Sequence, residues 1–178
     1  IRVFGMAEHM GAARGAALDS MRGAVRRAME DGAFGLASAL IYPPNTFATT
    51  DELVEEAKAM APYGGVYITH MRSEADRLLE AVDEVIRIAK EGGVAGEIYH
   101  LKAAGTRNWG KEVQVIAKID SARAAGIDIQ ANMYPYTAGA TGLTSCLPPE
   151  YSAEGKLFDN LASKEIRAKI RQEVEHPT

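Results

Sequence analysis

Residues 64–70 read GGVYITH, and residues 92–100 read GGVAGEIYH. Each stretch begins with a glycine pair, which breaks a preceding helix, and continues as a short apolar run that ends on a histidine. A run of this length bounded by turn residues is typical of a buried strand. The two histidines, His70 and His100, therefore take the same place, the last residue of a strand, in two consecutive repeats.

Amphipathic helices alternate with these strands. Residues 16–30 and 73–92 each carry apolar side chains at spacings of three and four, the pattern of a helix with one buried face. The residues Thr49-Thr50-Asp51-Glu52 read as a capping box, in which the Thr49 side chain bonds the Glu52 amide and the Glu52 side chain reaches back. Further helices are expected behind this box to Met60, over 110–125 and in the tail from Leu157.

The spacing of the strands indicates the fold class. The expected strands end near Ile41, His70, His100 and Met133, which gives one βα unit about every 30 residues. Repeated βα units imply a parallel α/β sheet with right-handed crossovers. Two architectures satisfy this pattern: a doubly wound open sheet and part of a (β/α)8 TIM barrel. A whole barrel needs about 250 residues, so four units would make about half of one.

Composition narrows the class of protein. The chain has 178 residues, 47% of them hydrophobic and 25% charged, and a net charge of -4. This balance is ordinary for a soluble domain, and without a Lys/Arg cluster it argues against a nucleic-acid partner. No apolar run approaches the roughly 20 residues needed to span a bilayer, and the opening Ile1-Arg2-Val3-Phe4 does not read as a signal peptide. A single cysteine excludes a multi-cysteine zinc site and favours a cytoplasmic location.

His70 and His100 are the strongest candidates for chemistry. Function in parallel α/β proteins gathers at the carboxyl ends of strands. Neighbouring strands lie about 4.8 Å apart, so two imidazoles at adjacent strand ends can share one metal ion at about 2.1 Å from each nitrogen. The alternative is a pair of buried histidines satisfied by backbone groups. Their matched positions favour the pair of metal ligands.

Three residues near the histidines are candidates for binding an anionic substrate group. Arg72 and Lys102 each follow a histidine by two positions, where a cation would suit a carboxylate. Tyr134 follows the last strand, where its hydroxyl could donate a hydrogen bond. Spacing alone leaves the alternatives open, since solvated basic residues and a packed Tyr-Pro turn would give the same pattern.

Glu97 lies three residues before His100 in the same expected strand. An odd offset places two strand side chains on opposite faces. We therefore expect Glu97 to point away from His100, without a direct role at the metal.

Several short strings of residues are specific in combination. They occur in this order: Gly32–Leu36 with Ile41–Pro44, Thr69–Glu74 (THMRSE), His100–Gly105 (HLKAAG) with Asn108–Lys111 (NWGK), Tyr134–Ala138 (YPYTA), and Thr141–Leu143 with Leu147–Pro149. Together they resemble the motifs of the N-acyl-D-amino-acid deacylase (D-aminoacylase) family, which belongs to the amidohydrolase superfamily. The resemblance runs from about residue 20 to about residue 175.

The resemblance implies a metal-dependent (β/α)8 barrel that hydrolyses the amide bond of N-acyl-D-amino acids or related small N-acyl compounds. His70 and His100 match the family's zinc-binding histidines, and Lys102 and Tyr134 match residues at the substrate carboxylate. Residues 1–178 would then form one partial barrel domain of about four βα units.

The chain also departs from the family pattern. The His-x-His pair of the first barrel strand, the cysteine that helps hold the tight metal and the catalytic aspartate of the last strand are not among its residues. We therefore expect an internal fragment that is inactive by itself, and no catalytic residue is assigned within it. Because half a barrel leaves strand edges and an apolar face open, self-association into a homo-oligomer is expected.

Two other functions are compatible with the same fold. A hydantoinase-like or dihydroorotase-like cyclic amide hydrolase would bridge its metals with a carboxylated lysine, whereas the strand ends here offer histidines. A non-catalytic α/β binding protein would keep the fold and bind no metal at His70 and His100. Fold alone does not separate these functions.

Overall fold

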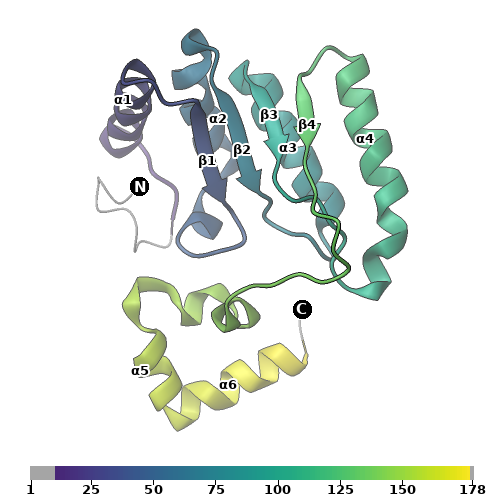
Figure 1. The fold of residues 1–178 in the computed structure, drawn as a ribbon. Helices are drawn as coiled ribbons and strands as arrows, with labels where there is room; N and C mark the ends of the chain where they lie inside the picture. The colour runs from purple at the N-terminus through teal and green to yellow at the C-terminus, as the bar shows by residue number, and fades with distance from the viewer. Residues whose placement is uncertain (1–10, 177–178) are drawn as a thin grey trace.

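A parallel four-stranded sheet organises the chain in the computed structural model, which describes residues 11–176 (Figure 1). The strands lie across the sheet in sequence order, with the register pairing Ala39 with His70 and Ile68 with Glu97. Consecutive barrel units give this order, whereas a doubly wound sheet reverses it at a switch point. The strands are β1 (Gly35–Ala39), β2 (Val66–His70), β3 (Ala95–Ile98) and β4 (Ile129–Ala131).

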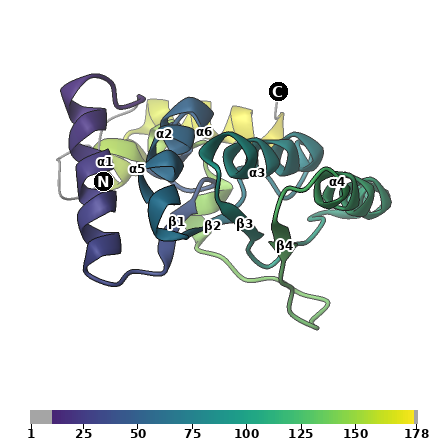
Figure 2. The same cartoon turned by 90° about the horizontal axis from the view of Figure 1, so that it is seen from above.

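Four long helices form a single layer on one side of this sheet, as Figure 2 shows. They are α1 (Ala16–Glu30), α2 (Thr50–Met60), α3 (Leu78–Gly92) and α4 (Glu112–Ala124), and each packs against the next along the chain. A doubly wound fold would cover both faces of the sheet with helices. The prediction of about four βα units of a barrel is therefore confirmed, and the doubly wound alternative is wrong.

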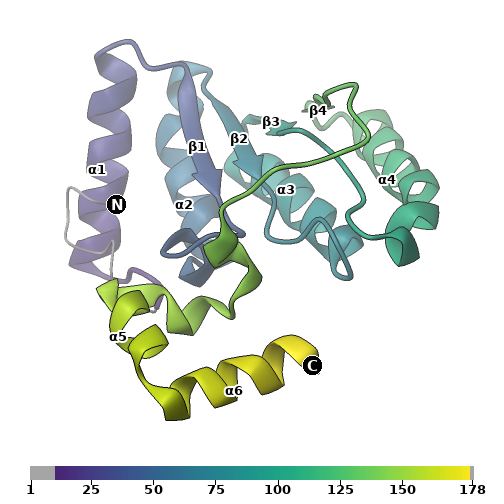
Figure 3. The ribbon, with the colours of Figure 1, turned by 60° about the horizontal axis from the view of Figure 1, so that its bottom comes forward.

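The segment after β4 lies beyond the carboxyl ends of the strands. Figure 3 shows the chain leaving β4 and running past these ends to α5 (Leu157–Ala162) and α6 (Lys164–Glu175). The helical tail was predicted from Leu157 onward, and the structure confirms it. The short 3-10 helices are Asn45–Phe47, Ala61–Tyr63, Thr106–Lys111, Leu143–Cys146, Pro149–Tyr151 and Ala153–Gly155.

The core lies between the sheet and the helix layer. Leu40, Tyr67, Ile98 and Ile129 from the sheet side are completely buried against apolar side chains of α2, α3 and α4. The Tyr67 hydroxyl keeps a polar partner inside this core, because it lies 2.7 Å from Ser38 Oγ. No helix of residues 11–176 covers the other face of the sheet, where Val66 is 38% exposed.

Several expected boundaries differ in the structure. Strands β1, β3 and β4 end two residues before Ile41, His100 and Met133, so only His70 is the last residue of its strand. The α3 helix begins at Leu78 rather than at Ser73, whose hydroxyl accepts a hydrogen bond from the Ala75 amide in a separate turn. Residues 71–77 are thereby left outside the helix.

The expected capping box is only half formed. The Thr49 hydroxyl accepts a hydrogen bond from the Glu52 amide, as predicted. The Glu52 carboxylate does not reach back to Thr49, however, but accepts the Ala13 amide at 2.8 Å, outside α2. The second half of the box is therefore wrong, because a contact distant in sequence takes the carboxylate.

No helix among residues 11–176 combines the length and apolar character that crossing a membrane requires. The opening residues, for which no signal peptide is expected, lie outside the described part of the chain.

Two buried carboxyl groups on α2 give a prediction about pH. Glu52 and Glu56 lie one helical turn apart, and both are buried. Burial raises the pKa of Glu56 from 4.5 to about 7, and the neighbouring Glu52 adds to this rise. The folded chain holds the Glu56 proton to a higher pH than the unfolded chain does. The contribution of Glu56 to the free energy of unfolding is therefore fully present below pH 4.5 and is lost as the pH rises through 7.

We expect Glu56→Gln to raise the free energy of unfolding above pH 7 by about 1–3 kcal/mol and to flatten its pH dependence. Urea denaturation at pH 5 and pH 8 measures both effects. Glu55→Gln is the matched control, since Glu55 is more exposed and ion-paired with Lys58. A parent chain with the same stability at both pH values would contradict this account of Glu56.

Candidate metal centre

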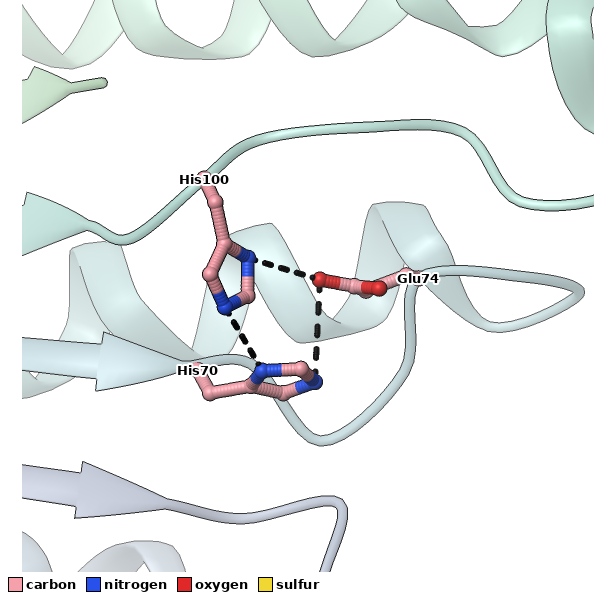
Figure 4. Close-up of side chains that lie close together, drawn as sticks. All are labelled: His70, Glu74 and His100. Carbon is pink, nitrogen blue, oxygen red and sulfur yellow. Dashed lines mark hydrogen bonds and ion pairs between the residues drawn. The ribbon is translucent and has the colours of Figure 1, made fainter. Parts of the chain in front are cut away.

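His70 and His100 come together at the carboxyl ends of adjacent parallel strands (Figure 4). The His70 Nδ1 atom lies 2.8 Å from His100 Nε2, and the ring centroids are 4.4 Å apart. Their side chains are 14% and 18% exposed, so both rings are mostly buried but still reachable by a small ligand. The expected convergence of the two histidines is thus present in the structure.

His100 reaches this place through a bend rather than by continuing the strand. It is the second residue after β3 and has a φ of 41°, in the left-handed region that non-glycine residues rarely occupy. The alternation of faces therefore stops before His100. Glu97 pairs in register with Ile68, which lies on the same face of β2 as His70, so the expected separation of Glu97 from the site by sheet face is wrong.

Glu74 is a third member of the site, and sequence reasoning missed it as a functional residue. Its Oε1 atom lies 3.1 Å from His100 Nδ1 and 3.6 Å from His70 Nε2. The three side chains can together hold a metal ion. The available signal was a carboxylate four residues after a strand-end histidine, and it becomes significant only because residues 71–77 lie outside the helix that was expected from Ser73.

The protons of the two imidazoles can be assigned from their neighbours. Lys102 Nζ lies 2.8 Å from His100 Nδ1, and an ammonium group can only donate, so this nitrogen accepts. A neutral His100 then carries its proton on Nε2 and donates it to His70 Nδ1. His70 Nε2 is buried and has no hydrogen-bond partner within residues 11–176.

This donor set fits a divalent metal of the zinc type. Zinc is bound by neutral imidazole nitrogens and by carboxylate oxygens. Burial lowers the pKa of His70 below its usual value, which favours the neutral form that a metal requires. His70 Nε2 makes no hydrogen bond to any described residue, and Glu74 Oε1, which accepts from Lys102, lies 3.6 Å from it. Both atoms can act as metal ligands.

Lys102 and Tyr134 lie at the edge of the same site. Lys102 Nζ donates to Glu74 Oε1 at 2.6 Å and stands 5.4 Å from the centre of the Tyr134 ring. The Tyr134 ring centroid is in turn 6.4 Å from that of His100. A cation and a phenol are therefore grouped beside the histidines.

Arg72 occupies a different environment. Its guanidinium donates to the Glu84 carboxylate at 2.8 Å and to the carbonyl oxygens of Thr46 and Ala48. Through these hydrogen bonds Arg72 connects residues 46–48 to α3, which is a structural role. They do not support the expectation that Arg72 binds substrate, which stays a prediction.

The sequence is similar to those of known deacylases. The chain is 34% identical over 164 residues to the D-aminoacylase of Alcaligenes xylosoxydans xylosoxydans, covering 84% of this chain and 33% of that protein. It is 39% identical over 114 residues to an N-acyl-D-glutamate deacylase of the same organism, covering 64% of this chain and 23% of the relative. No family model matches the chain.

Solved structures of deacylases also match the chain. A D-aminoacylase crystal structure, described as defining a novel subset of amidohydrolases, matches with a TM-score of 0.70 and 34% identity over 73% of this chain and 27% of that one. This chain fits the D-aminoacylase family of amidohydrolases. The N-acyl-D-glutamate deacylase of Bordetella bronchiseptica, complexed with zinc and a phosphonate inhibitor, matches with a TM-score of 0.69 and 33% identity over 71% of this chain and 27% of that one.

The D-aminoacylase match covers part of the fold only. The chain spans about a third of the length of the first curated relative, so its four βα units correspond to part of a TIM barrel. The shared segment includes strands β2 and β3, which carry the histidine pair of the candidate metal centre.

Proposed function

We propose that this chain supplies part of the metal centre and part of the substrate site of an enzyme that hydrolyses the amide bond of N-acyl-D-amino acids. The observation that carries the proposal is the cluster of His70, Glu74 and His100 at the carboxyl ends of parallel strands, with Lys102 beside it. The relatives named as deacylases support the choice of reaction.

His70 and His100 would hold a zinc ion through ring nitrogens, with Glu74 as a further ligand. A bound zinc ion supplies Lewis-acid polarisation of the acyl carbonyl. The neutral state of His70 and the low exposure of both rings suit this role, since a proton or bulk water at the ring nitrogens would compete with the metal. The zinc complex of the Bordetella enzyme is consistent with this choice of metal.

Lys102 would bind the carboxylate of the substrate by charge-assisted hydrogen bonding, with the Tyr134 hydroxyl as a second donor. The contacts of its ammonium group with Glu74 Oε1 and with the Tyr134 ring, which place it beside the histidine pair, support this role. Proton transfer falls to an aspartate that the family resemblance places after the matched segment. We therefore expect no turnover by the 178 residues alone.

The two alternative functions are less well supported. A cyclic amide hydrolase would use a carboxylated lysine between its metals, whereas histidines, His70 and His100, lie at the ends of β2 and β3 here. In a binding protein without a metal, the buried His70 Nε2 atom would have no described partner to offset its burial. We infer a small-molecule partner and a cytoplasmic location, with neither nucleic acid nor membrane as a partner.

Zinc binding tests the metal centre. We expect the purified chain to bind zinc weakly, because it offers two imidazoles and one shared carboxylate. Isothermal titration should show that His70→Ala and His100→Ala abolish this binding and that Glu74→Gln weakens it about tenfold. His176→Ala is the control, since His176 is exposed after α6. Tight binding that survives both histidine substitutions would place the metal elsewhere.

Ligand binding tests the substrate class. N-Acetyl-D-methionine added to the zinc-loaded chain should shift amide resonances around Lys102 and Tyr134. Lys102→Ala should weaken this binding by about tenfold or more, because it removes a charge-assisted hydrogen bond. Lys118→Ala, which removes a lysine paired with Asp83 on the outer helices, should not. Equal affinity in both variants would rule out Lys102 as the carboxylate partner.

Self-association is the third expected property, and it concerns the isolated chain. The sheet face without helices and the free edges of β1 and β4 expose apolar and backbone groups, including Val66 at 38% and Tyr99 at 49%. Burial of apolar surface stabilises an interface by about 25 cal/mol per Å², so a second copy would cover these groups. Sedimentation at micromolar concentration should show a dimer or larger species. A monomer throughout that range would contradict this proposal.

A further inference from the structure

A single residue, Asn132, holds the bend that carries His100. Its backbone amide donates to the Ile98 carbonyl at 3.1 Å, and its carbonyl accepts the Leu101 amide at 2.8 Å. Its side-chain Oδ1 accepts the His100 amide at 2.7 Å. Asn132 therefore bonds the backbone before the bend, within it and after it.

The bend matters because it sets where the His100 ring points. A φ of 41° at His100 is costly for a residue with a Cβ atom, and such a conformation persists only where the surroundings fix it. The hydrogen bond from the His100 backbone amide to Asn132 Oδ1 acts directly on the backbone of His100. If the bond were lost, the backbone could relax toward the β region and carry the imidazole away from His70.

Glu97 determines which way the Asn132 amide faces. Asn132 Nδ2 donates to Glu97 Oε1 at 2.8 Å. A carboxylate can only accept, and the His100 amide can only donate, so the Asn132 oxygen must face His100 and its nitrogen must face Glu97. The reverse orientation would place donor against donor and acceptor against acceptor.

We propose that Asn132 and Glu97 are positioning residues for His100, acting through the His100 backbone amide rather than by touching a metal or substrate. Glu97 orients the Asn132 side chain, and Asn132 holds the left-handed conformation that directs the imidazole toward His70. The consequence for metal affinity rests on the proposed function, whereas the positioning itself does not.

An exchange of chemical roles tests this chain of contacts. Asn132→Asp keeps an acceptor for the His100 amide but sets a second carboxylate against Glu97. The double variant Asn132→Asp with Glu97→Gln restores a donor–acceptor pair, because the side-chain amide introduced at position 97 can donate to the carboxylate introduced at position 132. Gln130→Ala is the control, since Gln130 is exposed on the neighbouring strand and in register with Glu97.

The first measurement is made on the metal-free chain by ¹H–¹⁵N NMR. The His100 amide proton should resonate downfield and exchange slowly in the parent and in Gln130→Ala. It should move and exchange faster in Asn132→Asp, and should return toward the parent value in the double variant. Asn132→Ala should show the largest change. A His100 amide unaffected by Asn132→Ala, or a double variant no closer to the parent than Asn132→Asp, would overturn the proposal.

The second measurement is zinc affinity in the same variants. Asn132→Asp and Asn132→Ala should bind zinc at least about tenfold more weakly than the parent, as is usual when a group that orients a metal ligand is lost. The double variant should recover most of this affinity. If no variant binds zinc, including the parent, the proposed metal site fails, and the NMR result still decides whether Asn132 and Glu97 position His100.

Discussion

The contact between His70 and His100 is the interaction on which the candidate site depends. It requires two neighbouring parallel strands that end at nearly the same level, with β2 delivering His70 directly and β3 delivering His100 after a bend. The 2.8 Å between His70 Nδ1 and His100 Nε2 leaves no room for a slip in register, because a shift of one residue would turn His70 to the helix side of the sheet. The buried layer of Tyr67, Ile98 and Ile129 under the helices opposes such a slip.

Glu74 links this pair of histidines to the substrate side of the site. A single oxygen, Oε1, lies 2.6 Å from Lys102 Nζ and 3.1 Å from His100 Nδ1. Since Glu74 is itself only 11% exposed, its charge is compensated mainly by the Lys102 ammonium group rather than by water. The position of Lys102, and with it the orientation of a substrate carboxylate, is thereby coupled to the metal-binding groups.

Much of this arrangement could be predicted from local sequence, because it follows from periodicity. The bounds of α1, the parallel α/β class and the end of β2 at His70 all follow from apolar spacing and glycine breaks. The paired place of His70 and His100 follows from the repeat of the βα unit. Lys102 and Tyr134 are candidates from their places after His100 and after the last strand, and the family resemblance also indicates them; both lie close to His100.

The remainder depends on contacts between residues far apart in sequence. Local sequence does not reveal that Arg72 donates to the Glu84 carboxylate on α3 and to the Thr46 carbonyl, and its expected role at the substrate stays a prediction. Glu97 was assigned to the wrong side because face alternation was extended through a bend that Asn132, 32 residues beyond His100, holds in place. X-ray absorption at the zinc edge of the zinc-loaded chain tests the central claim most directly. The account predicts imidazole scattering from two nitrogens at about 2.0–2.1 Å, reduced in His70→Ala and in His100→Ala; a spectrum without imidazole scattering, or one unchanged in both variants, would contradict it.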